Sequence, residues 1–386
     1  MQLFQYHDYI NVLIKPTNAC NLRCKYCFHI DTGFKPEVLS IEDFCHFCDI
    51  TMPYYKHVSI IWHGGEPSFV GLQNFKEYCE LAKEYARKYD VKLRLSMQSN
   101  GTLLNREFLQ FLKDEKIGVG ISYDGPINSV TRNSTAEFAK LKLLSDEINM
   151  KLGVITVVSG LNVNSLIETY KEMSELNIPL QLNHYVKTSE NQINELTLDE
   201  GVYLKQMYQL FDYWIADDKG KIQVDPLARY IRDLVLGSSN VCAHASCLRN
   251  WMCLNPDGII SPCDRDFPEE YCYGHVKEYS DIREVYNSKG YTSLIQKAII
   301  RRTKCKTDCE FYGVCEGGCN SNALVEGGLE NNGGFTCRIT KSLLGYIKNK
   351  MEELKMLENP DTIVNPVVKK IICSAAMKAE SLNEKY

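Results

Sequence analysis

The sequence predicts an α/β protein whose core is a parallel sheet. Short runs of β-branched and aliphatic residues alternate with stretches in which apolar residues recur at helical spacing. Alternation of this kind is typical of parallel strands joined by right-handed helical crossovers. Cysteine, glycine or acidic motifs directly follow four of the predicted strands, as ligand-binding residues do in such sheets.

Six strands alternating with helices are predicted in the first half of the chain. The strands cover residues 9–14, 58–62, 92–97, 119–123, 152–158 and 180–186. The helical patterns between them include residues 72–89, 106–115 and 164–176. Because the strands are parallel, the motifs that follow them are expected at one edge of the sheet.

Three cysteines in a CxxxCxxC spacing follow the first strand. They are Cys20, Cys24 and Cys27. Structural zinc sites and ordinary ferredoxin clusters take four protein ligands, so three thiolates are one short of a closed site. The loop is therefore a cluster site with one iron open to a ligand, or else a zinc site or three unrelated buried thiols.

The motif His63-Gly-Gly-Glu-Pro67 follows the second strand. Gly64 and Gly65 have no side chain to obstruct the close approach of a ligand. Glu66 supplies a carboxylate that can accept a hydrogen bond from an ammonium group. Gly-Gly and Glu-Pro are also turn formers, and so are the Asn100-Gly and Asp124-Gly pairs after the third and fourth strands.

A helical bridge is predicted after the sixth strand. One helix covers residues 197–217, capped by Thr197 or Asp199, and another covers residues 226–237. Large apolar residues recur at helical spacing in the first of these helices and are expected to form a packed core face. They are Tyr203, Met207, Leu210, Phe211 and Trp214.

Most of the remaining cysteines lie in the second half of the chain. They are Cys242, Cys247, Cys253, Cys263, Cys272, Cys305, Cys309, Cys315, Cys319 and Cys337. The Asp257-Gly258 pair between apolar residues predicts a β-hairpin between Cys253 and Cys263. So many thiols suit two four-cysteine sites better than one, although a zinc ribbon is compatible with any four of them.

Composition excludes some partners. The net charge of −5 argues against a nucleic-acid partner, and no apolar run is long enough to span a membrane. The first residues lack the features of a secretory signal, so a cytoplasmic protein is expected. Its 17 cysteines would then stay reduced and act mainly as metal ligands, which favours an anaerobic or microaerobic cell.

The cysteine loop, with Tyr26 and Phe28 flanking Cys27, resembles that of radical S-adenosylmethionine (SAM) enzymes. The resemblance implies a partial (β/α)6 barrel and a [4Fe-4S] cluster on Cys20, Cys24 and Cys27 whose fourth iron binds SAM. The Gly-Gly-Glu-Pro segment resembles the family motif that binds the SAM amino group. The cofactor-binding residues implied by position are Phe28, Gly64, Gly65, Glu66, Pro67, Asn100, Ser122, Asp124 and Arg132.

The second half resembles the SPASM extension of radical SAM proteins. The resemblance rests on the Gly258-xxxx-Cys263 hairpin, the Cys315-xxx-Cys319 pair and the trailing Cys337. It implies two auxiliary [4Fe-4S] clusters, the first on Cys242, Cys247, Cys263 and Cys319, and the second on Cys305, Cys309, Cys315 and Cys337. Two departures are the Cys305-xxx-Cys309 spacing, one residue longer than usual, and Cys253, which competes with Cys242.

These interpretations divide the chain into four ranges. Residues 1–195 form the radical SAM barrel, residues 196–240 the helical bridge, residues 241–345 the cysteine-rich SPASM domain and residues 346–386 a C-terminal helical tail.

The pattern is most similar to anaerobic sulfatase-maturating enzymes. This resemblance implies reductive cleavage of SAM to a 5′-deoxyadenosyl radical, abstraction of hydrogen from a residue of a peptide or protein, and an electron donor such as flavodoxin or ferredoxin. Asp264 matches the position of a general base in those enzymes. Other candidates for the base are Asp266, Tyr26 and His29.

Two departures favour a different peptide product. His63 stands where the maturases usually have Gln, and residues 181–186 differ from their usual strand-six sequence. We therefore expect a ribosomal-peptide maturase that gives an oxidised or crosslinked product with a thioether or carbon–carbon bond. The alternatives are a sulfatase maturase, which converts Cys or Ser to formylglycine, and a non-catalytic, metal-stabilised interaction protein.

Overall fold

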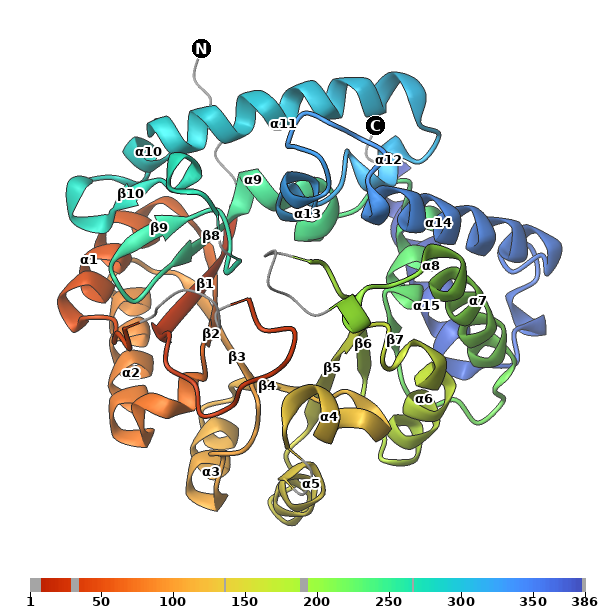
Figure 1. Cartoon of the computed structure of the whole chain (residues 1–386), viewed down its shortest axis with the longest axis horizontal. Helices are drawn as coiled ribbons and strands as arrows, with labels where there is room; N and C mark the ends of the chain where they lie inside the picture. Colours follow the sequence, from red (N-terminus) through yellow and green to blue (C-terminus); the bar gives the residue numbers. More distant parts are fainter. Residues whose placement is uncertain (1–7, 29–34, 135–136, 188–193, 266, 384–386) are drawn as a thin grey trace. The chain divides into compact units, whose positions relative to one another are not determined.

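The computed structural model of the chain describes residues 8–28, 35–134, 137–187, 194–265 and 267–383, and it confirms the α/β fold (Figure 1). All six predicted strands are present. They are β1 Tyr9–Thr17, β2 His57–Gly64, β3 Lys92–Ser99, β4 Gly118–Ser122, β5 Leu152–Val158 and β6 Leu180–His184. Strands β1 to β4 pair in chain order and in parallel. Strand β5 pairs in parallel with β6, and β6 with the short β7 Val224–Asp225.

The chain forms two compact units. The first comprises Met1–Ser122, Arg132–Leu152 and Ser246–Ile299, and the second Tyr123–Thr131, Gly153–Ala245 and Ile300–Tyr386. These units interleave along the chain and do not follow the ranges predicted from the sequence, so the functional boundaries at 195, 240 and 345 stay predictions.

The helices of the first unit are α1 Ile41–Thr51, α2 Leu72–Lys88, α3 Arg106–Asp114, α5 Glu137–Glu147, α9 Cys247–Asn250 and α10 Ile282–Val285. Those of the second unit are α6 Leu166–Glu175, α7 Glu200–Ala216, α8 Leu227–Leu236, α12 Tyr312–Cys315, α13 Asn320–Val325, α14 Phe335–Glu353 and α15 Pro366–Asn383. Helices α4 Asn128–Arg132 and α11 Lys289–Asp308 run from one unit into the other.

An aromatic core holds the helices of the first unit against its strands. Trp62 of β2 is fully buried. Its ring lies 5.8 Å from Phe44 of α1 and 5.5 Å from Phe75 of α2, measured between ring centroids. Phe75 also contacts Phe108 of α3 at 5.3 Å. Large aromatic side chains bury much apolar area each, so these contacts fix α1, α2 and α3 outside the strands, as Figure 1 shows.

The predicted helical bridge is also present. Asp199, one of the two predicted caps, accepts a hydrogen bond from the backbone N–H of Val202 at 2.9 Å and starts α7. Helix α8 ends at Gly237, whose φ of 63° is the left-handed conformation typical of a helix end. All five apolar residues predicted on the core face of α7 are buried.

The cysteine-rich half extends the sheet of the first unit. The predicted hairpin is formed by β8 Trp251–Leu254 and β9 Ile259–Ser261, which pair antiparallel. Strand β8 pairs in parallel with β1, from Asn11 opposite Trp251 to Ile14 opposite Leu254. Strand β10 Gly274–His275 then pairs with β9. The hairpin is therefore an integral part of the sheet that carries the cysteine loop.

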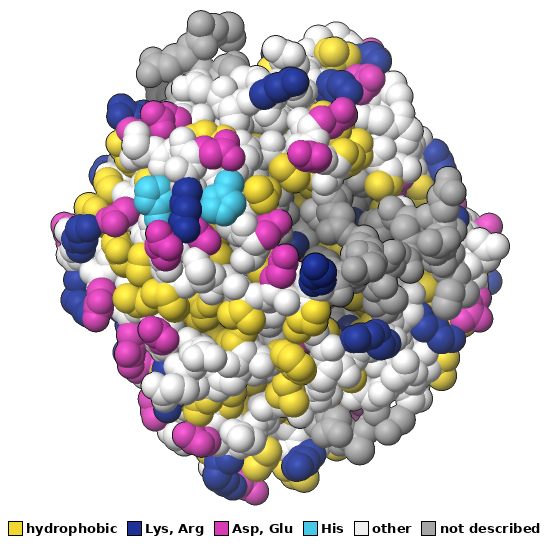
Figure 2. Space-filling view, turned by 60° about the vertical axis from the view of Figure 1, so that its left-hand side comes forward, with side chains coloured by type: hydrophobic (Ala, Val, Ile, Leu, Met, Phe, Trp, Pro, Cys, Tyr) yellow, Lys and Arg dark blue, Asp and Glu magenta, His cyan; other side chains and the backbone are white. Residues whose placement is uncertain are grey.

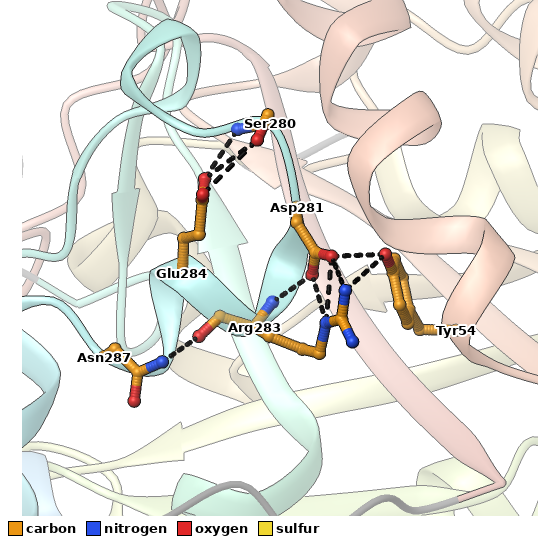
Figure 3. A network of polar contacts seen from close by, with 6 residues as sticks. All are labelled: Tyr54, Ser280, Asp281, Arg283, Glu284 and Asn287. Carbon is orange, nitrogen blue, oxygen red and sulfur yellow. Dashed lines mark hydrogen bonds and ion pairs between the residues drawn. The ribbon is translucent and has the colours of Figure 1, made fainter.

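Polar contacts join Asp281 and Arg283 to Tyr54, in the short helical turn Met52–Tyr54 that follows α1 (Figure 3). The Tyr54 hydroxyl donates to Asp281, and Arg283 Nε donates to both carboxylate oxygens of Asp281 at 2.9 Å. The Arg283 guanidinium lies 5.0 Å above the Tyr54 ring. Nearby, the buried hydroxyls of Tyr55 and Tyr286 are 3.1 Å apart. Segments that are far apart in sequence are therefore held in one unit by directional bonds.

The surface drawn in Figure 2 mixes acidic, basic and apolar side chains. One example of the pairing of charges is Lys277, whose Nζ lies 3.1 Å from Glu42 and 3.4 Å from Asp43. Among the helices in the described ranges, none combines the length and the apolar character that crossing a membrane requires.

We expect Asp281→Asn to lower the free energy of unfolding by about 1–3 kcal/mol at neutral pH, because Tyr54 loses an ionic acceptor. Hydrogen bonds from Arg283 lower the pKa of Asp281 to about 2. The unfolded pKa is about 3.9, so this stabilisation is present above pH 4 and disappears as the pH falls towards 2. Denaturant unfolding of both proteins at several pH values measures the difference.

The control is Asp361→Asn, which breaks an exposed ion pair with Lys369 and should leave stability unchanged. Equal effects of the two substitutions, or a difference that does not depend on pH, would contradict this account of the Asp281 network.

Candidate functional site

The cysteine loop follows β1 directly. Cys24 is buried, and Cys20, Cys27 and Phe28 are half-buried. The Cys27 N–H donates to the Cys24 carbonyl at 3.1 Å, which closes a turn between two predicted ligands. Burial raises the pKa of Cys20, whereas N–H donors from Leu22, at 3.4 Å, and Asn100, at 3.7 Å, act against that rise. The Cys20 sulfur therefore lies among donors that stabilise a thiolate.

Gly64 and Gly65 let the end of β2 lie against the cysteine loop. Any side chain at Gly64 would collide with the Thr17 carbonyl, and one at Gly65 with the Ala19 carbonyl. Gly64 also has a φ of 120°, which favours glycine. The Gly65 N–H donates to Thr17 at 3.1 Å. The backbone of the cysteine loop, rather than a ligand, therefore lies in close contact with these glycines. Their role in cofactor binding stays a prediction.

Glu66 is a buried carboxylate that joins the ends of β2 and β3. Its Oε1 accepts from the Ser68 N–H at 3.1 Å, the Ser68 hydroxyl at 2.5 Å and the Ser99 hydroxyl at 2.8 Å. Its Oε2 accepts from the Asn100 N–H at 2.7 Å. A carboxylate oxygen has two lone pairs, so Oε2 has the capacity for one further donor, such as an ammonium group. Sequence reasoning missed Ser99, whose only signal was its place beside Asn100 at the end of a strand.

Asn100, Arg132 and Ser122 also lie in the first unit. The Asn100 amide donates to Cys20 and, at 3.0 Å, to Asn21, so it fixes the loop. Arg132 is buried and donates to the Tyr26 hydroxyl at 2.5 Å, with its guanidinium 5.8 Å from the Tyr26 ring. Ser122 accepts from Gln98 at 2.8 Å. Asn100 and Arg132 therefore contact the cysteine loop directly, whereas Ser122 is bonded to β3.

Asp124 lies in the second unit and is fully buried. Its Oδ2 accepts from the Thr131 hydroxyl at 2.7 Å, and its Oδ1 from the Val157 N–H at 3.0 Å. These bonds join α4 to β5. Its predicted contact with SAM stays a prediction, and the structure gives Asp124 a structural role as well.

Asp264 lies beside two basic side chains from the ends of neighbouring strands. Its Oδ2 is 3.5 Å from Nδ1 of His63, the residue after Trp62 in β2. Burial alone would raise the pKa of Asp264, but the charges of His63, Lys15 and Arg265 together lower it. The carboxyl group is therefore ionised at neutral pH, as a general base must be. Lys15, in β1 and almost fully buried, was not singled out from the sequence.

Of the other candidates for the base, Tyr26 is engaged with Arg132, and Asp266 and His29 lie outside the described residues.

The ligands predicted for the first auxiliary cluster are divided between the units. Cys247 and Cys263 belong to the first unit, and Cys242 and Cys319 to the second. The Ser261 hydroxyl donates to the Cys263 carbonyl at 3.0 Å and holds the end of the hairpin. The competing Cys253 is fully buried in β8, where burial raises its pKa to about 12.

The four ligands predicted for the second auxiliary cluster all lie in the second unit. Burial, together with negative charge on the nearby Cys337, Cys305 and Cys309, raises the pKa of Cys315 to about 12. The unusual Cys305-xxx-Cys309 spacing has a helical explanation. Cys309 donates its N–H to the Cys305 carbonyl at 3.0 Å, so the two residues are one turn apart at the end of α11 and lie on one face.

A buried guanidinium braces the loop between Cys315 and Cys319. Arg301 is 1% exposed. It donates to the Gly317 carbonyl at 2.8 Å and to the Asn320 amide oxygen at 2.5 Å. A further bond reaches the Leu329 carbonyl. Burial raises the pKa of Cys305, and the charge of Arg301 acts against that rise. The ligands predicted for the clusters are all cysteine thiolates, which are the ligands that iron–sulfur clusters take. In the described ranges, no three His, Cys, Asp or Glu side chains converge on a single metal ion.

Two family models match the chain. The radical SAM superfamily model matches residues 14–173, and the SPASM model, an iron-sulfur cluster-binding domain, matches residues 242–317.

Curated relatives and solved structures match almost the whole length. The cysteine-type anaerobic sulfatase-maturating enzyme of Clostridium perfringens is 24% identical over 361 residues, which are 87% of this chain and 96% of the relative. The serine-type enzyme of Bacteroides thetaiotaomicron is 25% identical over 350 residues, 81% of this chain and 82% of the relative.

The structure of native anSMEcpe with bound AdoMet superposes with a TM-score of 0.78 at 23% identity and covers 89% of this chain and 98% of its own. The structure of Streptococcus suis SuiB bound to S-adenosylmethionine has a TM-score of 0.63 at 17% identity and covers 86% and 77%. The fold is therefore shared with both proteins.

We expect Arg301→Met to lower the free energy of unfolding by about 2–5 kcal/mol, because the buried carbonyls and the Asn320 amide lose their donor. Denaturant unfolding under anaerobic conditions measures the change. The matched control is Lys304→Met, on the same helix, which removes an exposed cation whose Nζ donates to the Glu330 carbonyl at 3.2 Å. Similar losses of stability in both variants would mean that positive charge in this region, rather than the hydrogen bonds of Arg301, stabilises the fold.

Proposed function

We propose that the chain oxidises one side chain of a peptide or protein substrate. Its radical SAM and SPASM domains imply that it binds SAM and [4Fe-4S] clusters. The SAM-binding cluster is assigned to Cys20, Cys24 and Cys27. The favoured reaction is the conversion of a Cys or Ser residue to formylglycine. The near full-length similarity to two types of sulfatase-maturating enzyme supports this choice over the crosslinking preferred from the sequence.

The observation that carries the proposal is the environment of Asp264. When bound, SAM and the clusters supply a hydrogen-abstracting radical and an acceptor for the second electron of the oxidation. The chain must then remove a proton from the substrate thiol or hydroxyl. Asp264 is ionised, half-buried and 3.5 Å from His63. It can therefore accept that proton while His63 and Lys15 hold the carboxylate in its charged state.

Other residues of the first unit act by holding this site in place. Glu66 and Asn100 fix the ends of β2 and β3 against the cysteine loop, and Arg132 holds Tyr26 within that loop. Since each of these side chains is bonded to protein partners, little reorganisation is needed when a cofactor binds.

A second candidate, crosslinking of a ribosomal peptide, is supported by His63. An imidazole beside Asp264 differs from the amide usual in maturases and changes the surroundings of the base. Streptococcus suis SuiB, which shares the fold, has a structure with a precursor peptide, SuiA.

The two candidates differ in the mass of the product. The protein is incubated anaerobically with SAM, a reductant and peptides that contain Cys or Ser, and the products are analysed by mass spectrometry. For a Cys peptide the masses differ: exchange of the sulfur for oxygen with loss of two hydrogens supports formylglycine, and loss of two hydrogens with retention of sulfur supports a crosslink. For a Ser peptide both products lose two hydrogens, so reaction of the product with a hydrazide, which an aldehyde gives and a crosslink does not, supports formylglycine. Cleavage of SAM without a change in the mass of any peptide would contradict the proposed function.

Replacing Cys20, Cys24 and Cys27 together with Ala should abolish reductive SAM cleavage. Auxiliary-cluster iron should remain, about eight of about twelve irons per chain, because the auxiliary ligands lie elsewhere. Chromatography of 5′-deoxyadenosine and iron analysis of the same sample measure both effects. Continued formation of 5′-deoxyadenosine would show that the catalytic cluster is misassigned.

Asp264→Asn should reduce peptide product about 10²–10⁴-fold, because the amide keeps the shape of the side chain but cannot accept the proton. Cleavage of SAM should continue uncoupled from product. The control Asp257→Asn changes an exposed residue of the same hairpin, where only a backbone contact to Ile259 is affected, and should keep coupled turnover. Full coupled turnover in Asp264→Asn, with normal iron content, would make Asp264 structural only.

A further inference from the structure

Tyr273 has a buried hydroxyl for which the described residues provide no hydrogen-bond partner. The residue lies between the β8–β9 hairpin and β10, and its N–H donates to the Ile260 carbonyl at 2.8 Å. Its side chain is 3% exposed. The hydroxyl oxygen is buried and has no hydrogen-bond partner among the described residues. Such atoms are uncommon in native interiors because desolvation is left uncompensated, so this one indicates a partner that is not part of the polypeptide described.

Tyr273 lies beside two segments that carry predicted cluster ligands. Its ring packs edge-on against Tyr291 at 5.5 Å, and the Tyr291 hydroxyl donates to the carbonyl of Leu248, the neighbour of Cys247, at 2.9 Å. The pairing of Tyr273 with Ile260 places it beside the strand that leads to Cys263. All of these residues belong to the first unit.

The electrostatics agree with this geometry. Burial raises the pKa of Tyr273 well above its ordinary value, and negative charge on Cys247, Cys263 and Cys272 raises it further. Because an ordinary tyrosine has a pKa of about 10, the hydroxyl carries its proton at neutral pH and is available as a donor. Two of these three cysteines are predicted ligands of the first auxiliary cluster.

We propose that the Tyr273 hydroxyl donates a hydrogen bond to a sulfur of the first auxiliary cluster and thereby tunes its reduction potential. The inference rests on the auxiliary clusters of the proposed function. A donor to a cluster sulfur stabilises the reduced state, which is more negative, and so raises the potential. Tyr273 thus acts through the cluster, as a positioning residue that helps it accept an electron.

The test is a redox titration of the anaerobic holoenzyme followed by electron paramagnetic resonance. Signals of the SAM-binding cluster are identified because they change when SAM is added. Tyr273→Phe should shift one auxiliary cluster to a more negative potential with unchanged iron content. The matched control is Tyr271→Phe, because Tyr271 is equally buried but its hydroxyl already accepts a hydrogen bond from Lys297 at 2.6 Å.

A second readout separates the hydrogen bond from a packing effect. In resonance Raman spectra, the iron–sulfur bands of the unmodified enzyme should shift between water and deuterium oxide, and part of that shift should vanish in Tyr273→Phe. If that variant does not assemble its auxiliary clusters, difluorotyrosine in place of Tyr273 keeps the ring and strengthens the donor. It should move the potential in the opposite direction.

Unchanged potentials and unchanged deuterium shifts would overturn the inference, and so would equal shifts in Tyr271→Phe. If Cys272→Ala alone abolishes the effect of Tyr273→Phe without loss of iron, the partner of the hydroxyl is the Cys272 thiol and the inference is also wrong. Failure of the proposed function looks different. The unmodified protein would then cleave SAM without modifying any peptide, while the shift in Tyr273→Phe would persist.

Discussion

The carboxylate of Glu66 is the constraint on which the site most depends. A buried charge is tolerated only when hydrogen bonds replace the lost hydration, and Glu66 obtains them from Ser68, Ser99 and Asn100. These donors come from the segments that follow β2 and β3, so the ends of the two strands cannot move independently. Asn100 in turn donates to Cys20. One carboxylate therefore couples two strand ends to the cysteine loop, and it has lone-pair capacity left for a ligand.

Local patterns predicted most of the fold. The six strands, the α7 and α8 helices and the hairpin at Gly258 were recognised because alternation, helical spacing and turn residues are short-range signals. The pairing of β8 with β1 was missed, since a four-residue strand carries no information on which edge it joins. The contact of Asp281 and Arg283 with Tyr54 was missed for the same reason, because it joins segments more than two hundred residues apart.

The candidate site, like the fold, contains residues that local patterns predict and residues that they do not. Motif spacing and the family resemblance predicted roles for the cysteines, the glycines and Asp264, because their chemistry is visible in the residue type, and these roles stay predictions. It did not identify Lys15, Arg301 or Tyr273, whose importance depends on burial and on what surrounds them. A lysine in a strand and an arginine in an amphipathic helix are ordinary in sequence. Only the fold shows that one lies beside a carboxylate and the other donates into a loop between two predicted ligands.

The neighbours of Asp264 bear on the choice between the two candidate reactions. Formation of formylglycine and formation of a thioether both require loss of a proton from the substrate, so an ionised Asp264 serves either one. His63 distinguishes them more directly, because an imidazole can carry a charge that an amide cannot. The charge of His63, together with those of Lys15 and Arg265, lowers the pKa of Asp264, against the effect of burial. The departure at His63 therefore bears on the proposed base as well as on the proposed substrate site.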